Sequence, residues 1–164
     1  LKLFEAIEAH GKELSLKLYG ARALMSLRLE KNWGAWTLDF RPDFTAAESG
    51  LDVFINWNKD FIGKKASLDE KKQGIKKKLV TMTIDTKDID VTNDEAILKD
   101  NKCVGYITSG GYAHHVKKSM ALGYVPEELS KHETTLEVEI NGKLYKACVT
   151  DKPLYDSNGE KMRM

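Results

Sequence analysis

The sequence predicts an α+β protein in which a helical, aromatic first part precedes a small antiparallel β-barrel. In the first part the apolar residues recur at helical spacing, as Leu1, Phe4 and Ile7 do at the start. In the second part the apolar period becomes two, and short strand-like stretches alternate with turn signals, which is typical of a barrel or a sandwich. We therefore predict two units, residues 1–74 and residues 75–164.

Three helices are predicted in the first part, because these stretches are rich in good helix formers and glycine follows two of them at the position of a helix stop. They span Leu1–His10, Ala21–Lys31 and Ala66–Gln73. We expect Leu24, Leu27 and Met25 of the second helix to face the core. Arg28 and Glu30 are expected nearer the edge of that core.

Two further signals precede the third helix. Thr45 and Glu48 have the spacing of a capping box, in which each side chain satisfies a free amide at a helix start, and Gly50 follows as a stop. Leu51–Trp57 alternates apolar and polar residues and predicts a strand. Leu14–Tyr19 alternates as well and predicts a short extended segment.

Large aromatic side chains gather in the passage between the second and third helices. They are Trp33, Trp36, Phe40, Phe44 and Trp57, and they include all three tryptophans of the chain. One interpretation is a plain apolar core. The other is a wall for a flat heteroaromatic ligand, because such rings offer a large contact area with little loss of entropy.

Six strand-like stretches are expected in the second part. They are Lys78–Asp85, Ala96–Leu98, Cys103–Thr108, Ser119–Val125, Thr135–Ile140 and Lys143–Thr150. Asn141-Gly142 separates the last two and supplies the positive φ angles that a two-residue hairpin needs. The last residues, 151–164, are rich in turn formers and are expected to wrap back along the surface.

Composition indicates a globular protein and excludes several classes. Of the 164 residues 41% are hydrophobic and 31% charged, with a net charge of +1, so no overall field attracts nucleic acid or an anionic membrane. No apolar run reaches membrane-spanning length and no signal peptide opens the chain. Cys103 and Cys148 stand in apolar, strand-like contexts and are predicted to be reduced core thiols. We therefore expect a cytoplasmic location.

Residue spacing alone predicts neither a catalytic residue nor a metal site. The chain has no glycine-rich phosphate loop and no Cys/His spacing that suits zinc. His114 and His115 would point to opposite faces of a strand, so the prediction is a surface pair.

A basic run lies where the two predicted units meet. It consists of Lys71, Lys72, Lys76, Lys77 and Lys78. A solvated face is the interpretation that we favour. A patch for an anionic partner is the alternative, in which the protein is a stand-alone β-barrel module that binds a protein or nucleic acid.

Taken together, several segments resemble a known family. They are GARALMSLRLEKNWGAW, TAAESGLDVFI and FIGKKA in the first part, and VGYITSGGYAHHVKKSMALGYVP and LYKACVTDKPLYD in the second. The first three are similar to the end of the folate-binding half of dimethylglycine and sarcosine dehydrogenases, which resembles the glycine cleavage T-protein (aminomethyltransferase). The last two are similar to the C-terminal barrel of that family. Residues 1–74 would then be an incomplete folate-binding segment.

The resemblance implies a tetrahydrofolate-dependent one-carbon enzyme as the parent protein. Its substrate would be a small amine whose one-carbon unit is transferred to tetrahydrofolate. In the dehydrogenase branch a separate N-terminal half carries FAD and oxidises the amine. The family's catalytic aspartate would lie upstream of Leu1, so we expect this chain alone to be inactive. Its uncovered apolar surface would favour self-association.

The same resemblance gives four candidate cofactor-binding positions and no catalytic one. Arg28, Trp36 and Glu48 match positions in family motifs. Val53 stands where close relatives have a tyrosine near the folate, and Leu24 stands where the T-protein has an arginine for the folate tail. The family's pattern is thus only partly present in this sequence.

Overall fold

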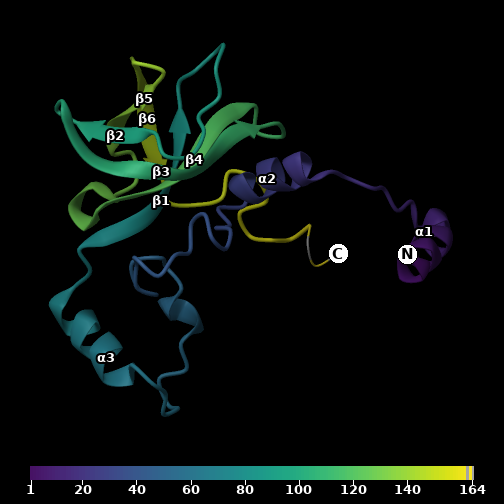
Figure 1. The fold of residues 1–164 in the computed structure, drawn as a ribbon, viewed down its shortest axis with the longest axis horizontal. Coiled ribbons are helices and arrows are strands. Elements are labelled where there is room, and N and C mark those ends of the chain that lie inside the picture. The colour runs from purple at the N-terminus through teal and green to yellow at the C-terminus, as the bar shows by residue number, and fades with distance from the viewer. Residues whose placement is uncertain (162, 164) are drawn as a thin grey trace.

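The computed structural model describes residues 1–161 and 163. A closed β-barrel forms the second part of the chain, and a mostly irregular segment with short helices lies against it and below it (Figure 1). The α-helices are α1 (Lys2–Gly11), α2 (Ala21–Glu30) and α3 (Lys64–Gln73), and the 3-10 helices are η1 (Lys12–Leu14), η2 (Asp52–Phe54) and η3 (Glu127–Leu129). The strands are β1 (Lys77–Ile84), β2 (Ala96–Lys99), β3 (Lys102–Ala113), β4 (Lys118–Pro126), β5 (Thr135–Ile140) and β6 (Lys143–Thr150). The predicted α+β class with a small antiparallel barrel is confirmed.

The barrel closes in the order β1-β4-β3-β2-β5-β6, with β6 returning to β1, and every pair is antiparallel. Tight turns set the register of two hairpins. Asn141 and Gly142 have φ values of 50° and 76°, as a two-residue turn requires, and Asp100 and Asn101 do the same between β2 and β3 with 51° and 61°. The sequence predicted the Asn141-Gly142 hairpin because this turn chemistry is local.

The barrel core is built from alternate residues of the strands. Val80, Met82 and Ile84 of β1 point inward and are at most 6% exposed, and they pack on residues such as Ile107 and Val138. Each such side chain contributes about 1.5–3 kcal/mol on burial. Gly105 allows a close approach of strands, because a Cβ there would lie 1.9 Å from the backbone oxygen of Tyr124.

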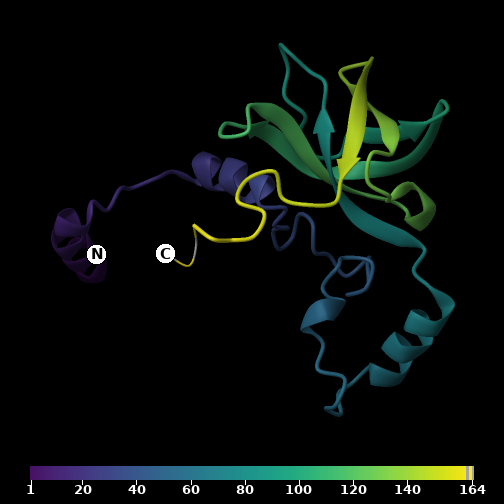
Figure 2. The same cartoon turned by 180° about the vertical axis from the view of Figure 1, so that it is seen from behind.

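The outer face of β3 and β4 is covered by α2 and the irregular residues after it, as the opposite views show (Figures 1 and 2). Leu29 is only 1% exposed in this contact, and Arg28 and Glu30 are buried beside it. Leu24 and Leu27 are each 48% exposed, so the prediction that they face the core was wrong. Helical periodicity identified an apolar stripe, whereas the barrel contacts the last turn of the helix.

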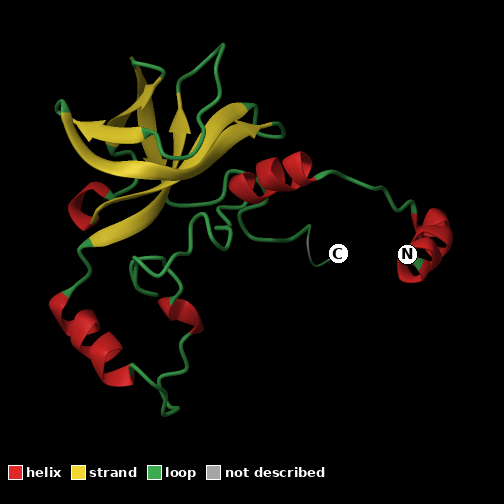
Figure 3. Ribbon diagram, viewed as in Figure 1, coloured by secondary structure: helices red, strands yellow, loops and turns green. Residues whose placement is uncertain are grey.

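The predicted strand Leu51–Trp57 is also absent. The segment forms η2 and irregular chain (Figure 3). The side chains of Val53 and Phe54 are largely exposed. Because the barrel is closed, it offers no free edge with which this apolar alternation could pair. For Leu14–Tyr19 the prediction was a short extended segment: η1 ends at Leu14, and the residues after it run as extended chain toward α2 without pairing as a strand (Figure 1).

Other local predictions had mixed outcomes. Thr45 and Glu48 form the hydrogen bonds of the capping box, with distances of 3.1 and 3.2 Å from the backbone nitrogens to the side-chain oxygens. The residues after Thr45 form turns rather than a helix, and Gly50 has a positive φ of 70°. Cys103 is exposed rather than buried, and both cysteines are free. The three predicted helices all form, within three residues of the expected bounds.

Helix α1 lies away from the barrel and is joined to α2 by an extended linker (Figures 1 and 2). Its apolar residues Leu3, Phe4 and Ile7 are 48–74% exposed. Among the helices that the structure describes, none is both long and apolar enough to cross a membrane.

Candidate functional site

A buried carboxylate joins the irregular segment to the barrel. Asp39 has no exposed surface. Its Oδ2 accepts hydrogen bonds from Nη1 of Arg28 at 2.9 Å and from the backbone N–H of Ala35 at 2.7 Å. Its Oδ1 accepts the hydroxyls of Thr108 and, at 2.7 Å, Ser109 on β3. Both carboxylate oxygens are therefore satisfied, and the segment after α2 is held against β3 by charge-assisted bonds.

The backbone of Asp39 makes a second contact with the barrel. The Tyr124 hydroxyl on β4 donates to the Asp39 carbonyl at 3.0 Å and lies 2.7 Å from the Ser49 hydroxyl. The Tyr124 ring stacks on Phe44 with centroids 3.4 Å apart. Burial raises the pKa of the Tyr124 phenol above its ordinary value of 10.0. The phenol is therefore a neutral donor at physiological pH.

Glu30 makes a comparable junction at the end of α2. Its side chain is 1% exposed. Its Oε1 accepts hydrogen bonds from the backbone N–H groups of His115 and Val116 in the β3–β4 turn, and its Oε2 has no hydrogen-bond partner within the described residues. The backbone N–H of Tyr155 donates to the Glu30 carbonyl, so the residues after β6 turn back to α2. The sequence predicted that this tail wraps back along the surface but not which element it meets. His114 and His115 are exposed, which confirms the predicted surface pair.

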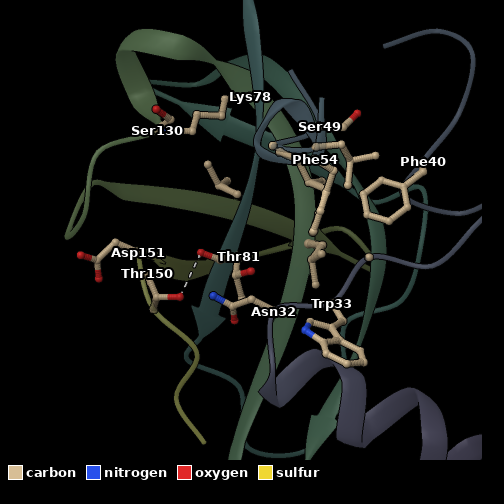
Figure 4. A pocket seen from close by; sticks show the side chains of 16 residues that line it. Asn32, Trp33, Phe40, Ser49, Phe54, Lys78, Thr81, Ser130, Thr150 and Asp151 are labelled. Atoms are coloured by element: carbon tan, nitrogen blue, oxygen red, sulfur yellow. Dashed lines mark hydrogen bonds between the residues drawn. The ribbon is translucent and has the colours of Figure 1, made fainter. Parts of the chain in front are cut away.

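A groove of about 510 Å³ lies beside the Asp39 junction, where Phe40 and Ser49 are among the residues that line it (Figure 4). Trp33, Phe40 and Phe54 supply aromatic surface along it, and β1 forms the opposite side. Asn32 has a positive φ of 54° and its buried Oδ1 has no partner within the described residues. Lys78 also lines the groove. A volume of this order and a mostly apolar wall with a few polar groups suit a small organic ligand.

The four candidate residues do not meet in this groove. Arg28 is engaged with Asp39 and with the Trp33 carbonyl, and Glu48 is used by the capping box and by the backbone N–H of Lys77. Trp36 is 78% exposed and packs edge-on against Phe40 at 5.8 Å.

Val53 is 77% exposed and lines a neighbouring cavity of about 450 Å³ beside α3, which shares Gly50 and Lys78 with the groove. Within the described part of the chain no cluster of His, Cys, Asp or Glu could hold a metal ion. The structure thus separates the four positions, and their roles toward a cofactor stay predictions.

Comparison with known proteins matches both parts of the chain. Residues 77–156 match the glycine cleavage T-protein C-terminal barrel domain, and residues 1–59 match the GCVT N-terminal domain. The two matches follow one another along the chain. The chain belongs to the glycine cleavage T-protein family.

Individual relatives agree with this assignment. Human mitochondrial dimethylglycine dehydrogenase is 41% identical over 154 residues, covering 93% of this chain and 18% of that protein. The aminomethyltransferase of Synechocystis is 37% identical over 140 residues, covering 84% of this chain and 37% of that protein. The crystal structure of aminomethyltransferase T from Bartonella henselae superposes with a TM-score of 0.80 at 25% identity, over 86% of this chain and 40% of that chain. The chain spans less than half the length of each of these relatives.

Sequence reasoning missed the residues that organise the site. Asp39, Asn32 and Ser49 stood in an aromatic, turn-rich passage where nothing local distinguishes a junction from a surface turn. The one available signal was a lone acidic residue between Leu38 and Phe40, two large apolar side chains.

Proposed function

We propose that this chain supplies one wall of a folate cavity, and the barrel that supports it, in an enzyme that transfers an amine-derived one-carbon unit to tetrahydrofolate. The relatives named above as aminomethyltransferase and dimethylglycine dehydrogenase support this proposal. The observation that carries it is the aromatic groove fixed to the barrel by Asp39. A binding wall that is already held rigid loses little conformational entropy when a ligand binds.

The groove suits part of a tetrahydrofolate molecule. Trp33 and Phe54 offer flat surfaces for a heteroaromatic ring or an aminobenzoyl ring. The unpartnered Asn32 Oδ1 would accept an N–H of the ligand, and Lys78 would attract a ligand carboxylate. Tetrahydrofolate would supply the nitrogens that receive the one-carbon unit.

The groove covers only one face of a ligand, so this chain alone would not enclose a folate molecule. Trp33 and Phe54 remain 56% and 81% exposed, so a bound ring would be covered on one face only. We assign no catalytic group to this chain. Under this proposal the catalytic carboxylate and the rest of the cavity belong to the portion of the relatives that this chain does not match. FAD would act in a further half of a dehydrogenase-type parent.

The partners under this proposal are the folate and a small amine, with neither nucleic acid nor a membrane involved. The exposed apolar side chains of α1 and of the aromatic passage would also drive self-association of the isolated chain. A cytoplasmic location stays a prediction, and the dimethylglycine dehydrogenases named here are mitochondrial.

The alternative function is a stand-alone barrel module that binds a protein or nucleic acid. The lysines of the basic run are all exposed, which this alternative requires. Binding of single-stranded nucleic acid that weakens steeply with salt would favour it.

The test is to read the coding sequence upstream of Leu1 and to express the longest open frame. We expect this longer protein to form methylene-tetrahydrofolate from an amine donor, and a Trp33→Ala variant to raise the KM for folate. Asp43→Asn serves as a surface control in the same segment. A short frame that starts just upstream of Leu1, together with salt-dependent binding of nucleic acid, would overturn the proposal.

A further inference from the structure

A second cavity, remote from the aromatic groove, lies at one end of the barrel. It has a volume of about 510 Å³ and is lined by the end of β1, the start of β4 and the middle of β6, together with the residues that follow β1. It shares no residue with the aromatic groove. Strand pairing accounts for its position, because Ile84 at the end of β1 pairs with Ser119 of β4 and with Ala147 of β6.

Lysines surround this cavity. They are Lys87, Lys117, Lys118 and Lys146, and Asp85 is the one acidic residue among the described residues that line it. None of the four ammonium groups forms an ion pair with a carboxylate of the described residues. Four positive charges against one negative charge around a single concavity produce a local positive potential, although the chain as a whole is nearly neutral.

A buried hydroxyl provides an independent indication of a ligand. Ser119 is 3% exposed and lines the cavity, yet its Oγ has no hydrogen-bond partner within the described residues. Leaving such a group unsatisfied costs about 1–3 kcal/mol, so buried hydroxyls normally have a partner. Tyr112, which pairs with Ser119 across β3 and β4, also lines the cavity.

The side chains that line the cavity indicate which class of ligand it would bind. A hydroxyl donor and several separate ammonium groups suit a compact oxyanion with many acceptor oxygens, because lysine acts as a point charge. Among the described residues no arginine lines the cavity, so its positive charges are the point charges of lysines rather than planar forks that make bidentate bonds. The volume exceeds that of one phosphate group and leaves room for the rest of a small molecule.

We infer that this end of the barrel binds the phosphate group of a small phosphorylated molecule, with Ser119 Oγ as a donor and Lys118 and Lys146 among its charge partners. The site is separate from the proposed folate wall. Its occupancy therefore does not depend on the one-carbon chemistry, and its test is independent of the test of that function.

The experiment is an NMR titration of this chain with inorganic phosphate, recorded by ¹⁵N–¹H correlation spectra. We expect saturable shifts confined to the amides around Ser119, Lys146 and Thr86, and weaker binding as sodium chloride is added. Citrate is titrated in parallel at matched ionic strength. Citrate that binds tenfold more tightly than phosphate would show a carboxylate site and would contradict the phosphate assignment.

Three variants make the inference sharper. Lys118→Gln/Lys146→Gln should weaken phosphate binding about fivefold, whereas Lys102→Gln/Lys143→Gln, which removes the same charge from exposed positions elsewhere on the barrel, should leave it unchanged. Ser119→Ala should weaken binding about tenfold without loss of thermal stability, because the removed hydroxyl has no partner in the fold. Equal effects of the two lysine pairs, or unchanged binding in Ser119→Ala, would overturn the inference.

Discussion

Replacing Asp39 with asparagine tests the junction between the irregular segment and the barrel. The substitution keeps the size of the side chain and removes its charge. Arg28 is 8% exposed and Asp39 has no exposed surface, so the guanidinium would be left in the protein without its counter-charge. Breaking a buried ion pair from one side typically costs about 3–5 kcal/mol. The new amide also places a donor where the side chain now accepts bonds from Arg28, Ala35, Thr108 and Ser109.

We expect Asp39→Asn to lower the free energy of unfolding by about 4 kcal/mol. Urea denaturation is followed by tryptophan fluorescence and by far-ultraviolet circular dichroism. All three tryptophans lie before the barrel, so fluorescence reports the segment and dichroism is dominated by the strands. The fluorescence transition should move to lower urea than the dichroism transition.

The control is Asp43→Asn, four residues away. Asp43 pairs with Arg41 at 3.4 Å but is 66% exposed, and a surface pair of this kind contributes at most about 1 kcal/mol. If Asp39→Asn and Asp43→Asn destabilise the chain equally, Asp39 does not hold the segment to the barrel and the reasoning fails.

Three further outcomes follow from the same contacts. Tyr124→Phe removes the hydrogen bonds to Asp39 and Ser49 and should cost about 1–2 kcal/mol at neutral pH. Burial raises the pKa of Tyr124 in the folded chain, so above about pH 10 the Tyr124 phenol ionises in the unfolded chain first. With rising pH the free energy of unfolding of the wild type should therefore fall more steeply than that of Tyr124→Phe, and parallel pH profiles would contradict this. Gly105→Ala should cost about 3 kcal/mol in thermal unfolding because its Cβ meets a backbone oxygen, whereas Gly20→Ala, with open space around it, should change stability by less than about 0.5 kcal/mol. Trypsin should cut the linker at Lys17 before it cuts any strand, and mass spectrometry of the first fragments would reveal the opposite order.

The barrel could be predicted from the sequence because its signals are local. Asn141-Gly142 determines a turn wherever it stands between alternating strands, and the period-two pattern of β1 assigns Val80 and Met82 to the interior without reference to any distant residue. The capping box at Thr45 was predictable for the same reason.

The site was not predictable, because its contacts join residues far apart in the chain. Asp39 and Thr108 are separated by 69 positions, and no pattern around either residue indicates the other. The predicted orientation of α2 was wrong for a similar reason. The apolar stripe of the helix predicted that Leu24 and Leu27 are buried, but the contact with the barrel buries Leu29 instead. The neighbouring side chains of Arg28 and Glu30 are buried with it and form hydrogen bonds with Asp39 and the His115 backbone.

The absence of the predicted strand at 51–57 shows that alternating apolar and polar residues do not establish a strand by themselves. Val53 and Phe54 have the pattern of a strand but remain exposed, because a closed barrel has no edge to receive them. The sequence left open whether the aromatic passage is a core or a ligand wall. The structure places Trp33 and Phe40 along an open groove, whereas Trp36, Phe44 and Trp57 are not among the residues that line it.

Calorimetric titration of this chain with tetrahydrofolate tests the central proposal most directly. A wall that covers one face of a ring should give weak or undetectable heat, and Trp33→Ala should remove whatever binding is seen. Tight binding with one folate per chain would contradict the account, because it would mean that these residues enclose a complete pocket by themselves.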